Sequence, residues 1–163
     1  MVSDLKEVLT RYKSLPKFKD GRIDYSNSDS APVLTVFVKF RGNLLLLKRS
    51  SKVNSYKGLW NTVAGYLDEF KPLEEKILEE LREEIGLKKE DLLSIKVGLA
   101  YEFHDQKNNM TWIVFPALAV LKHKPEIRLD WEHTEYQWVK PEELEKFECV
   151  PSLKKSLDYA STS

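Results

Sequence analysis

The sequence lacks the features that would assign it to a disulfide-rich, membrane-spanning or strongly charged class. It has one cysteine, Cys149, among 163 residues, which excludes an intrachain disulfide and a metal site built from several cysteines. No apolar run is long enough to span a bilayer. Lys and Arg together number 26, as do Asp and Glu. This balance gives no bulk attraction to an anionic membrane, and it makes nucleic acid an unfavoured partner.

The composition is that of an ordinary globular protein. The hydrophobic fraction is 42%, and 163 residues suffice for one domain with a substantial core. The first ten residues are polar and charged and lack the apolar centre of a signal peptide. We therefore expect a cytoplasmic protein that does not associate with a membrane.

A polar stretch at residues 26–32, SNSDSAP, divides the sequence into two regions. Before it, apolar residues at helical spacing predict a short helix within residues 4–15, and an Asp-Gly pair predicts a hairpin within residues 17–25. We therefore expect an N-terminal extension over residues 1–31, which serves either as a lid on a pocket or as a contact in a homodimer. The main domain is expected over residues 32–163.

The main region alternates strand-like and helix-like runs irregularly. Strands are predicted at residues 33–40, 43–48, 59–64, 96–103, 111–121 and 136–139, and helices at residues 72–86, 141–147 and 152–160. Residues 44–47 are four consecutive leucines, as in a strand covered by helices on both faces. The pattern predicts the α/β class, with a mixed β-sheet between helical layers.

The helix predicted to end at Gly86 carries carboxylates in an unusual place. At about 100° per residue, Glu80 and Glu84 lie about 40° apart at the edge of the apolar stripe, whereas Glu79 lies on the solvent side. Two carboxylates at a core boundary repel each other and lose hydration, which is costly without a nearby cation. Oxygen ligands suit Mg²⁺ or Mn²⁺, and these ions bridge phosphate oxygens. The sequence therefore predicts a divalent-metal site for a phosphate substrate.

Residues 65–87, GYLDEFKPLEEKILEELREEIGL, resemble the signature of the Nudix hydrolases. That signature is Gly, five residues, Glu, seven residues, then Arg-Glu-aliphatic-any-Glu-Glu-any-Gly-aliphatic. Gly65 and residues 80–87 match it, and the flanking runs LLLLKRS, GLWNTVAG and EHTEYQWVKPEEL extend the resemblance over about residues 33–147. The resemblance implies a Nudix-type α/β/α sandwich. It also implies a Mg²⁺- or Mn²⁺-dependent pyrophosphohydrolase, in which metal-activated water cleaves the pyrophosphate bond of a nucleoside di- or triphosphate derivative.

The same resemblance assigns the metal ligands. Carried over to this sequence, Glu80, Glu83 and Glu84 bind the metal, and the backbone carbonyl of Ala64 completes the shell. Glu80 and Glu83 are also expected to be catalytic. A small-molecule nucleotide is the expected partner.

Further candidates lie outside the helix. Glu132, within EHTEYQW, is the strongest candidate for a general base or an additional ligand, with Glu135 and Glu102 as weaker alternatives. Lys48 and Arg49 end a strand where cationic side chains of the family reach phosphates. Four aromatic residues are candidates for stacking on a base or for core packing: Tyr56, Tyr101, Phe103 and Trp112.

Two positions depart from the signature in opposite senses. Lys71 stands at its first Glu and Glu79 at its Arg, so we predict an ion pair of reversed polarity between them. These departures keep a second function open, a Nudix-fold nucleotide-binding or regulatory module with little turnover. An isomerase of the isopentenyl-diphosphate type is less favoured because the segment 61–64 holds no cysteine. Processing of RNA ends is less favoured because the net charge is zero.

Overall fold

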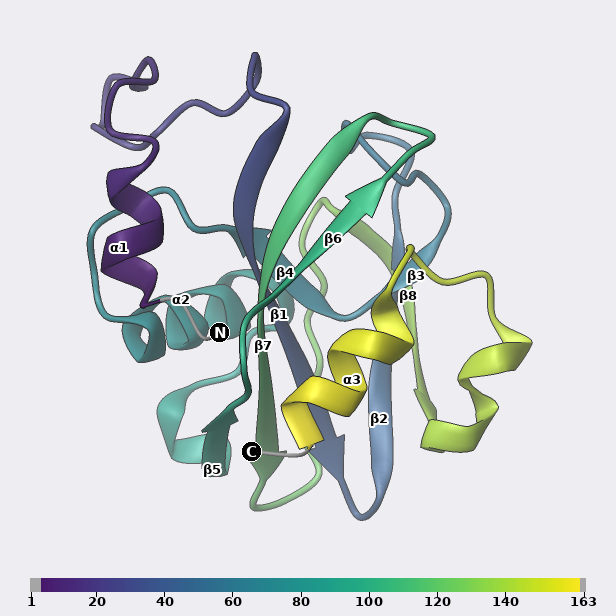
Figure 1. Cartoon of the computed structure of the whole chain (residues 1–163). Helices are drawn as coiled ribbons and strands as arrows, with labels where there is room; N and C mark the ends of the chain where they lie inside the picture. Colours follow the sequence, from purple (N-terminus) through teal and green to yellow (C-terminus); the bar gives the residue numbers. More distant parts are fainter. Residues whose placement is uncertain (1–3, 162–163) are drawn as a thin grey trace.

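The structure is a computed structural model that describes residues 4–161. At its centre is an eight-stranded sheet (Figure 1). Its strands are β1 (Ser30–Phe40), β2 (Asn43–Arg49), β3 (Trp60–Asn61), β4 (Val63–Tyr66), β5 (Leu92–Val97), β6 (Tyr101–Asp105), β7 (Met110–Leu121) and β8 (His133–Val139). The central path runs β3-β2-β1-β7-β5, while β4 pairs with β1, β6 with β7 and β8 with β2. β1 and β7 are parallel from Ser30↔Thr111 to Lys39↔Val120, and the other pairs are antiparallel. The sheet is therefore mixed, as predicted.

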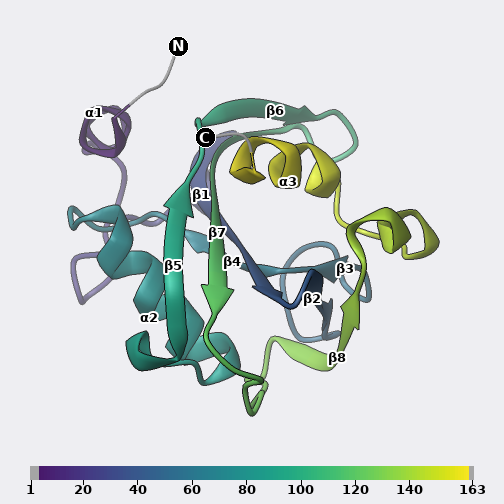
Figure 2. The ribbon, with the colours of Figure 1, turned by 90° about the horizontal axis from the view of Figure 1, so that it is seen from below.

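Helices cover both faces of this sheet. α2 (Leu73–Ile85) and α3 (Leu153–Ser161) lie on opposite sides (Figure 2). Side chains alternate between the two faces along β2: Leu45 and Leu47 join the core that contains α2, whereas Leu44 and Leu46 join the core that contains α3. The run of four leucines thus reflects burial on both faces, and the predicted α/β/α sandwich is confirmed.

Three predicted elements differ from the structure. The strand expected at 96–103 is two strands, β5 and β6, because the chain breaks at Gly98, where a Cβ would collide with the backbone carbonyl oxygen of Tyr159 in α3. The strand expected at 59–64 is likewise divided into β3 and β4. The helix expected at 141–147 is a 3₁₀ helix, η2 (Pro141–Lys146). A second 3₁₀ helix, η1 (Lys89–Asp91), precedes β5.

The N-terminal segment packs on the α2 side of the sheet. It contains α1 (Leu5–Thr10) and a narrow hairpin with one antiparallel bridge, Lys17↔Ile23. Val8, Leu9, Ile23 and Tyr25 are buried in the same core as α2. Residues 1–3 of the predicted extension and 162–163 of the predicted main domain lie outside the described residues. None of the described helices is long and apolar enough to cross a membrane.

Candidate active site

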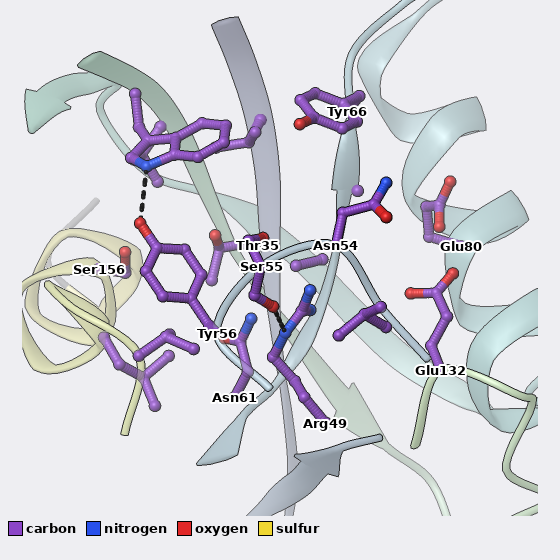
Figure 3. Close-up of a pocket in the computed structure, with 18 of the residues that line it drawn as sticks. Thr35, Arg49, Asn54, Ser55, Tyr56, Asn61, Tyr66, Glu80, Glu132 and Ser156 are labelled. Carbon is purple, nitrogen blue, oxygen red and sulfur yellow. Dashed lines mark hydrogen bonds between the residues drawn. The ribbon is translucent and has the colours of Figure 1, made fainter. Parts of the chain in front are cut away.

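A cavity of about 360 Å³ opens beside the inner edge of α2 and holds most of the predicted site residues (Figure 3). β1 and β4 contribute its floor, the loop 53–56 one wall, and Glu132 with the end of β2 another. Figure 3 shows the carboxylates of Glu80 and Glu132 on one side and the ring of Tyr56 across the cavity. Carboxylates from α2 and from the loop before β8 therefore face one hollow.

The ends and the apolar stripe of α2 fix where its glutamates lie: Glu80 lines the cavity, whereas Glu84 is buried and is not among the lining residues. The helix begins after Pro72 and ends at Gly86, which takes the left-handed conformation (φ 75°) that glycine favours. Ile77, Leu81 and Ile85 are fully buried, and this fixes which face of the helix packs against the core. Glu80 and Glu84 are then 9% and 2% exposed, and their predicted place at the core boundary is confirmed.

Gly65 lets the Glu80 carboxylate approach strand β4. A Cβ at Gly65 would lie 2.9 Å from Cδ of Glu80 and 3.0 Å from its Oε2, closer than van der Waals contact allows. The first glycine of the signature is therefore needed for space, because the carboxylate rests directly against the backbone.

Glu84 is the most buried carboxylate of the site. Its Oε1 accepts a long hydrogen bond from the amide of Ala64 (3.5 Å) and lies 3.7 Å from Nε2 of His133. Its Oε2 is buried with no hydrogen-bond partner among the described residues. Burial, reinforced by the neighbouring Glu80 and Glu132, raises the pKa of Glu84 well above its ordinary value.

Glu132 lies on the loop before β8, on the same side of the cavity as Glu80 (Figure 3). Its backbone carbonyl accepts a hydrogen bond from the Ser50 amide at 2.7 Å, which fixes the loop to the end of β2. Burial raises the pKa of Glu132 to about 7, and the negative charges of Asp130 and Glu80 add to the effect. A carboxylate with this pKa can accept a proton near neutral pH.

His133 is buried behind these carboxylates. Its Nδ1 lies 3.2 Å from Oδ1 of Asp130 and its Nε2 faces Glu84. Burial lowers the pKa of His133, which favours the neutral ring. The hydrogen bond of His133 is to Asp130, and its Nε2 lies against Glu84 at 3.7 Å, beyond hydrogen-bond distance, so we read it as a structural residue.

Two lysines pair with carboxylates of α2: Lys71 on the outer edge, opposite the cavity, and Lys76 between that edge and the cavity. Lys71 Nζ donates to Glu79 Oε2 at 2.8 Å, so the predicted reversed ion pair is present. Lys76, with a side chain 5% exposed, places its ammonium 3.3 Å from Glu80 Oε1, 3.6 Å from Glu79 Oε1 and 3.7 Å from Asp68 Oδ1. Burial alone would lower the pKa of Lys76, but these carboxylates outweigh it and the net shift is upward.

The two predicted cationic residues separate in the structure. Arg49 lines the cavity, and its Nε donates to the backbone carbonyl of Ser55 at 3.0 Å. Lys48 is not among the cavity residues, and its ammonium lies 3.7 Å from Glu135 on the neighbouring strand β8. The structure therefore brings Arg49 to the carboxylates and directs Lys48 elsewhere.

The remaining candidates divide into residues that line the cavity and residues that do not. Glu83 is exposed on α2 and lines the cavity, and Ala64 lines it from β4. Glu102 is exposed on β6 and lies outside it. Tyr101 contacts Ser156 and the ring of Tyr159 in α3.

Aromatic side chains form one wall of the cavity. Trp112 Nε1 donates to the hydroxyl of Tyr56 at 3.1 Å, and that hydroxyl donates to Asp105. Tyr66, 46% exposed, has its ring centre 6.0 Å from that of Trp112. Of the four predicted aromatic candidates, Tyr56 and Trp112 line the cavity, whereas Tyr101 and Phe103 do not.

Several cavity residues were not identified from the sequence. Tyr66, Asn61, Lys76 and Arg22 line it, but no signal in their immediate sequence marks them. Tyr66 is the exception, because strand alternation puts it on the same face as Ala64, a predicted ligand two residues earlier.

The carboxylates that line the cavity and those beside it fit a hard divalent cation. Ligand atoms of Glu79, Glu80 and Glu83 lie within 4.8 Å of one another, as do those of Glu84, Glu132 and His133. The unpartnered Oε2 of Glu84 lacks the compensation that a buried carboxylate needs. Carboxylate oxygens are the ligands that Mg²⁺ and Mn²⁺ prefer.

The chain matches known proteins over most of its length. The model of the NUDIX domain matches residues 29–159. A nucleoside triphosphatase, NudI of Escherichia coli, is 25% identical over 125 residues, which cover 71% of this chain and 86% of that protein. The crystal structure of a MutT protein from Methanosarcina mazei Go1 aligns with a TM-score of 0.65 at 20% identity, covering 79% of this chain and 91% of the other. The NUDIX domain of Shewanella oneidensis NrtR, complexed with ADP ribose, aligns with a TM-score of 0.66 at 14% identity, covering 80% and 86%.

The family match covers residues 29–159 of 163, far more than the signature at residues 65–87. The chain belongs to the Nudix family, and it is an enzyme of the pyrophosphohydrolase type that this family comprises.

Proposed function

We propose that this protein is a Mg²⁺- or Mn²⁺-dependent hydrolase that cleaves the pyrophosphate bond of a nucleoside di- or triphosphate derivative. The observation that carries the proposal is Glu84, a fully buried carboxylate whose Oε2 has no hydrogen-bond partner among the described residues. It lies on the same helix edge as Glu80, is too buried to line the cavity itself, and has a carboxylate oxygen within 4.8 Å of one of Glu132. Such a group is stable as an anion only beside a cation.

In this proposal Glu80, Glu83 and Glu84 hold the cation, with the carbonyl of Ala64 as a further ligand. When bound, the cation neutralises phosphate charge and makes water more acidic. Lys76 contacts Oε1 of Glu80, and Glu80 lines the cavity. Gly65 provides the space in which that carboxylate lies.

Glu132 is the proposed general base. It takes a proton from the attacking water because burial has moved its pKa to about 7, close to the pH at which a base is most effective. Arg49, on the same side of the cavity, is the proposed partner of a substrate phosphate, since a guanidinium matches phosphate oxygens in geometry and charge.

The substrate class is supported by the cavity and by the relatives. Tyr56, Tyr66 and Trp112 provide an aromatic wall on which a base can stack, and NudI is named a nucleoside triphosphatase. We therefore place nucleoside triphosphates first. The cytoplasmic location and the role of residues 1–31 as a lid or a homodimer contact stay predictions.

A substrate panel tests the proposal. Release of phosphate or pyrophosphate is measured with nucleoside triphosphates, ADP-ribose, NAD, diadenosine polyphosphates and GDP-sugars, in Mg²⁺ and in EDTA. We expect metal-dependent turnover that Glu83→Gln and Glu84→Gln abolish, while Glu75→Gln, on the exposed side of the same helix, leaves it unchanged. Turnover that survives EDTA and both active-site substitutions would contradict the proposal.

A nucleotide-binding module without turnover is the second candidate. The observation behind it is the ion pair between Lys71 and Glu79, the two positions at which the sequence departs from the signature. Nucleotide binding with no hydrolysis across the whole panel would select this alternative.

A further inference from the structure

Arg22 brings a guanidinium to the active-site cavity from outside the region that the family model matches. That match begins at residue 29, whereas Arg22 lies in the N-terminal hairpin and lines the same cavity as Glu80 and Glu83. The family match therefore does not account for this residue.

The hairpin is fixed to the loop that precedes α2. The amide of Ile23 donates to the backbone carbonyl of Asp68 at 2.9 Å, and the hydroxyl of Tyr25 donates to the backbone carbonyl of Leu67 at 2.6 Å. Ile23 and Tyr25 are 2% and 5% exposed, and the Tyr25 ring stacks on Tyr66 with centres 5.5 Å apart. Residue 22 is thus held in place by buried neighbours at the edge of the cavity.

The guanidinium itself is oriented but keeps donors for another ligand. Its Nε donates to Asp20 Oδ2 at 2.8 Å, and the same carboxylate accepts the backbone amide of Arg22 at 3.1 Å. Nη1 lies 3.8 Å from Asp68 Oδ2, beyond hydrogen-bond distance, and the side chain is 45% exposed. A guanidinium has five N–H donors, so most of them remain for a phosphate.

Arg22 also differs from the other cations that line the cavity. Lys76 is buried among carboxylates, and Arg49 holds the carbonyl of Ser55. A series of side-chain contacts links Arg22 to Glu80 in space. Arg22 lies 3.8 Å from Asp68, Asp68 lies 3.7 Å from Lys76, and Lys76 lies 3.3 Å from Glu80, measured between charged atoms. Arg22 therefore lines the cavity at the side of Asp68, separated from Glu80 by Asp68 and Lys76.

We propose that Arg22 binds the phosphate chain of the substrate at its outer end, so that the N-terminal hairpin completes the active site. The proposal rests on the function proposed above, because it takes the substrate to be a nucleoside polyphosphate. It makes residues before 29 a determinant of affinity for long phosphate chains, and it predicts little effect on the chemical step.

The test compares Arg22→Ala with Lys19→Ala. Lys19 is an exposed lysine of the same hairpin that does not line the cavity, so the two variants lose equal charge. Calorimetric titration with inorganic tripolyphosphate and with orthophosphate, both in Mg²⁺, reports binding whether or not the protein is active. We expect Arg22→Ala to weaken tripolyphosphate binding about tenfold and Arg22→Lys to recover part of the loss. Lys19→Ala should bind as the unmodified protein does, and orthophosphate binding should change little.

Steady-state kinetics with the best nucleotide of the panel complete the test. Arg22→Ala should raise KM about tenfold and leave kcat within about threefold, with a melting temperature close to that of Lys19→Ala. Equal tripolyphosphate affinity in the two alanine variants, or no measurable binding by the unmodified protein, would overturn the role of Arg22. If the unmodified protein hydrolyses no nucleotide but Arg22→Ala alone loses tripolyphosphate affinity, the proposed reaction fails and the binding role stands.

Discussion

The two edges of α2 carry the same residue type in opposite electrostatic states. On the outer edge, Glu79 lies within 4 Å of two lysines, Lys71 and Lys76. On the inner edge, Glu84 faces the neutral ring of His133 and other carboxylates. Solvation and pairing satisfy Glu79, and Lys76 also pairs with Glu80 on the inner edge. Glu84 Oε2, in contrast, has no hydrogen-bond partner among the described residues and requires an added cation. The difference shows that the identity of the residue does not decide its role; the nearest positive charge does.

The largest expected effect comes from neutralising the inner edge. Glu84→Gln should lower kcat by about a thousandfold, equivalent to about 4 kcal/mol, because a ligand of the cation is lost. The same substitution should stabilise the metal-free protein by about 1 to 3 kcal/mol, since an uncompensated buried charge is removed. Turnover and urea denaturation in EDTA measure the two quantities. A variant that is both inactive and less stable without metal would contradict the comparison.

The pH dependence of the metal-free protein sharpens the same point. The pKa of Glu84 in the folded protein lies well above the ordinary 4.5. The stability linked to this group is therefore fully present below about pH 4.5 and is lost as pH rises towards the folded pKa. We expect the free energy of unfolding of Glu84→Gln in EDTA to fall less steeply with rising pH than that of the unmodified protein. An unchanged slope of unfolding free energy against pH would show that Glu84 is not the group responsible.

Removing Lys76, the buried cation that contacts carboxylates of both edges, should act on stability first. Lys76→Met leaves Glu80, Glu79 and Asp68 without the ammonium that faces them, and breaking such a buried pair costs about 3 to 5 kcal/mol. Lys154→Met, at a position 68% exposed on α3, is the control and should change stability by less than about 0.5 kcal/mol. Equal, small effects of both substitutions would mean that the outer charges are solvated and not paired.

Glu132 tests the inner edge through catalysis. Glu132→Gln should lower kcat about a hundredfold. In the unmodified protein kcat/KM should rise with pH and level off at or below about pH 7, because the base acts only when deprotonated and a bound cation lowers its pKa further. Glu132→Gln should lose this rise of kcat/KM with pH. Glu135→Gln, at an exposed residue of β8, should keep it. If kcat/KM of Glu132→Gln still rises with pH in the same way, another group accepts the proton.

The sequence predicted the parts of this comparison that depend on local periodicity. The rotation of α2 follows from the spacing of Ile77, Leu81 and Ile85, so the burial of Glu80 and Glu84 could be predicted from the helix alone. The reversed pair of Lys71 and Glu79 could be predicted because two neighbouring departures had opposite charge.

The parts that depend on contacts between distant segments could not be predicted. Lys76 is buried because the loop at Asp68 folds over it, and Arg22 reaches the cavity because Ile23 pairs with that loop. The break at Gly98 reflects the passage of α3, more than fifty residues later. Lys48 and Arg49 were equivalent in sequence, but alternation along β2 directs only Arg49 towards the cavity.

The smallest expected effect concerns the outer pair itself. Lys71→Glu places a carboxylate beside Glu69 and Glu79, so it should destabilise the protein by about 1 kcal/mol or more, a cost that the partial exposure of both partners keeps small. Adding Glu79→Arg should recover only part of this loss, because the new guanidinium would also approach Lys76, now 3.6 Å from Glu79. Urea denaturation of the four proteins of this cycle gives the coupling energy, expected near 1 kcal/mol. Additive effects would show that the two side chains, although 2.8 Å apart, contribute independently, and the outer edge would then be no better paired than the inner one.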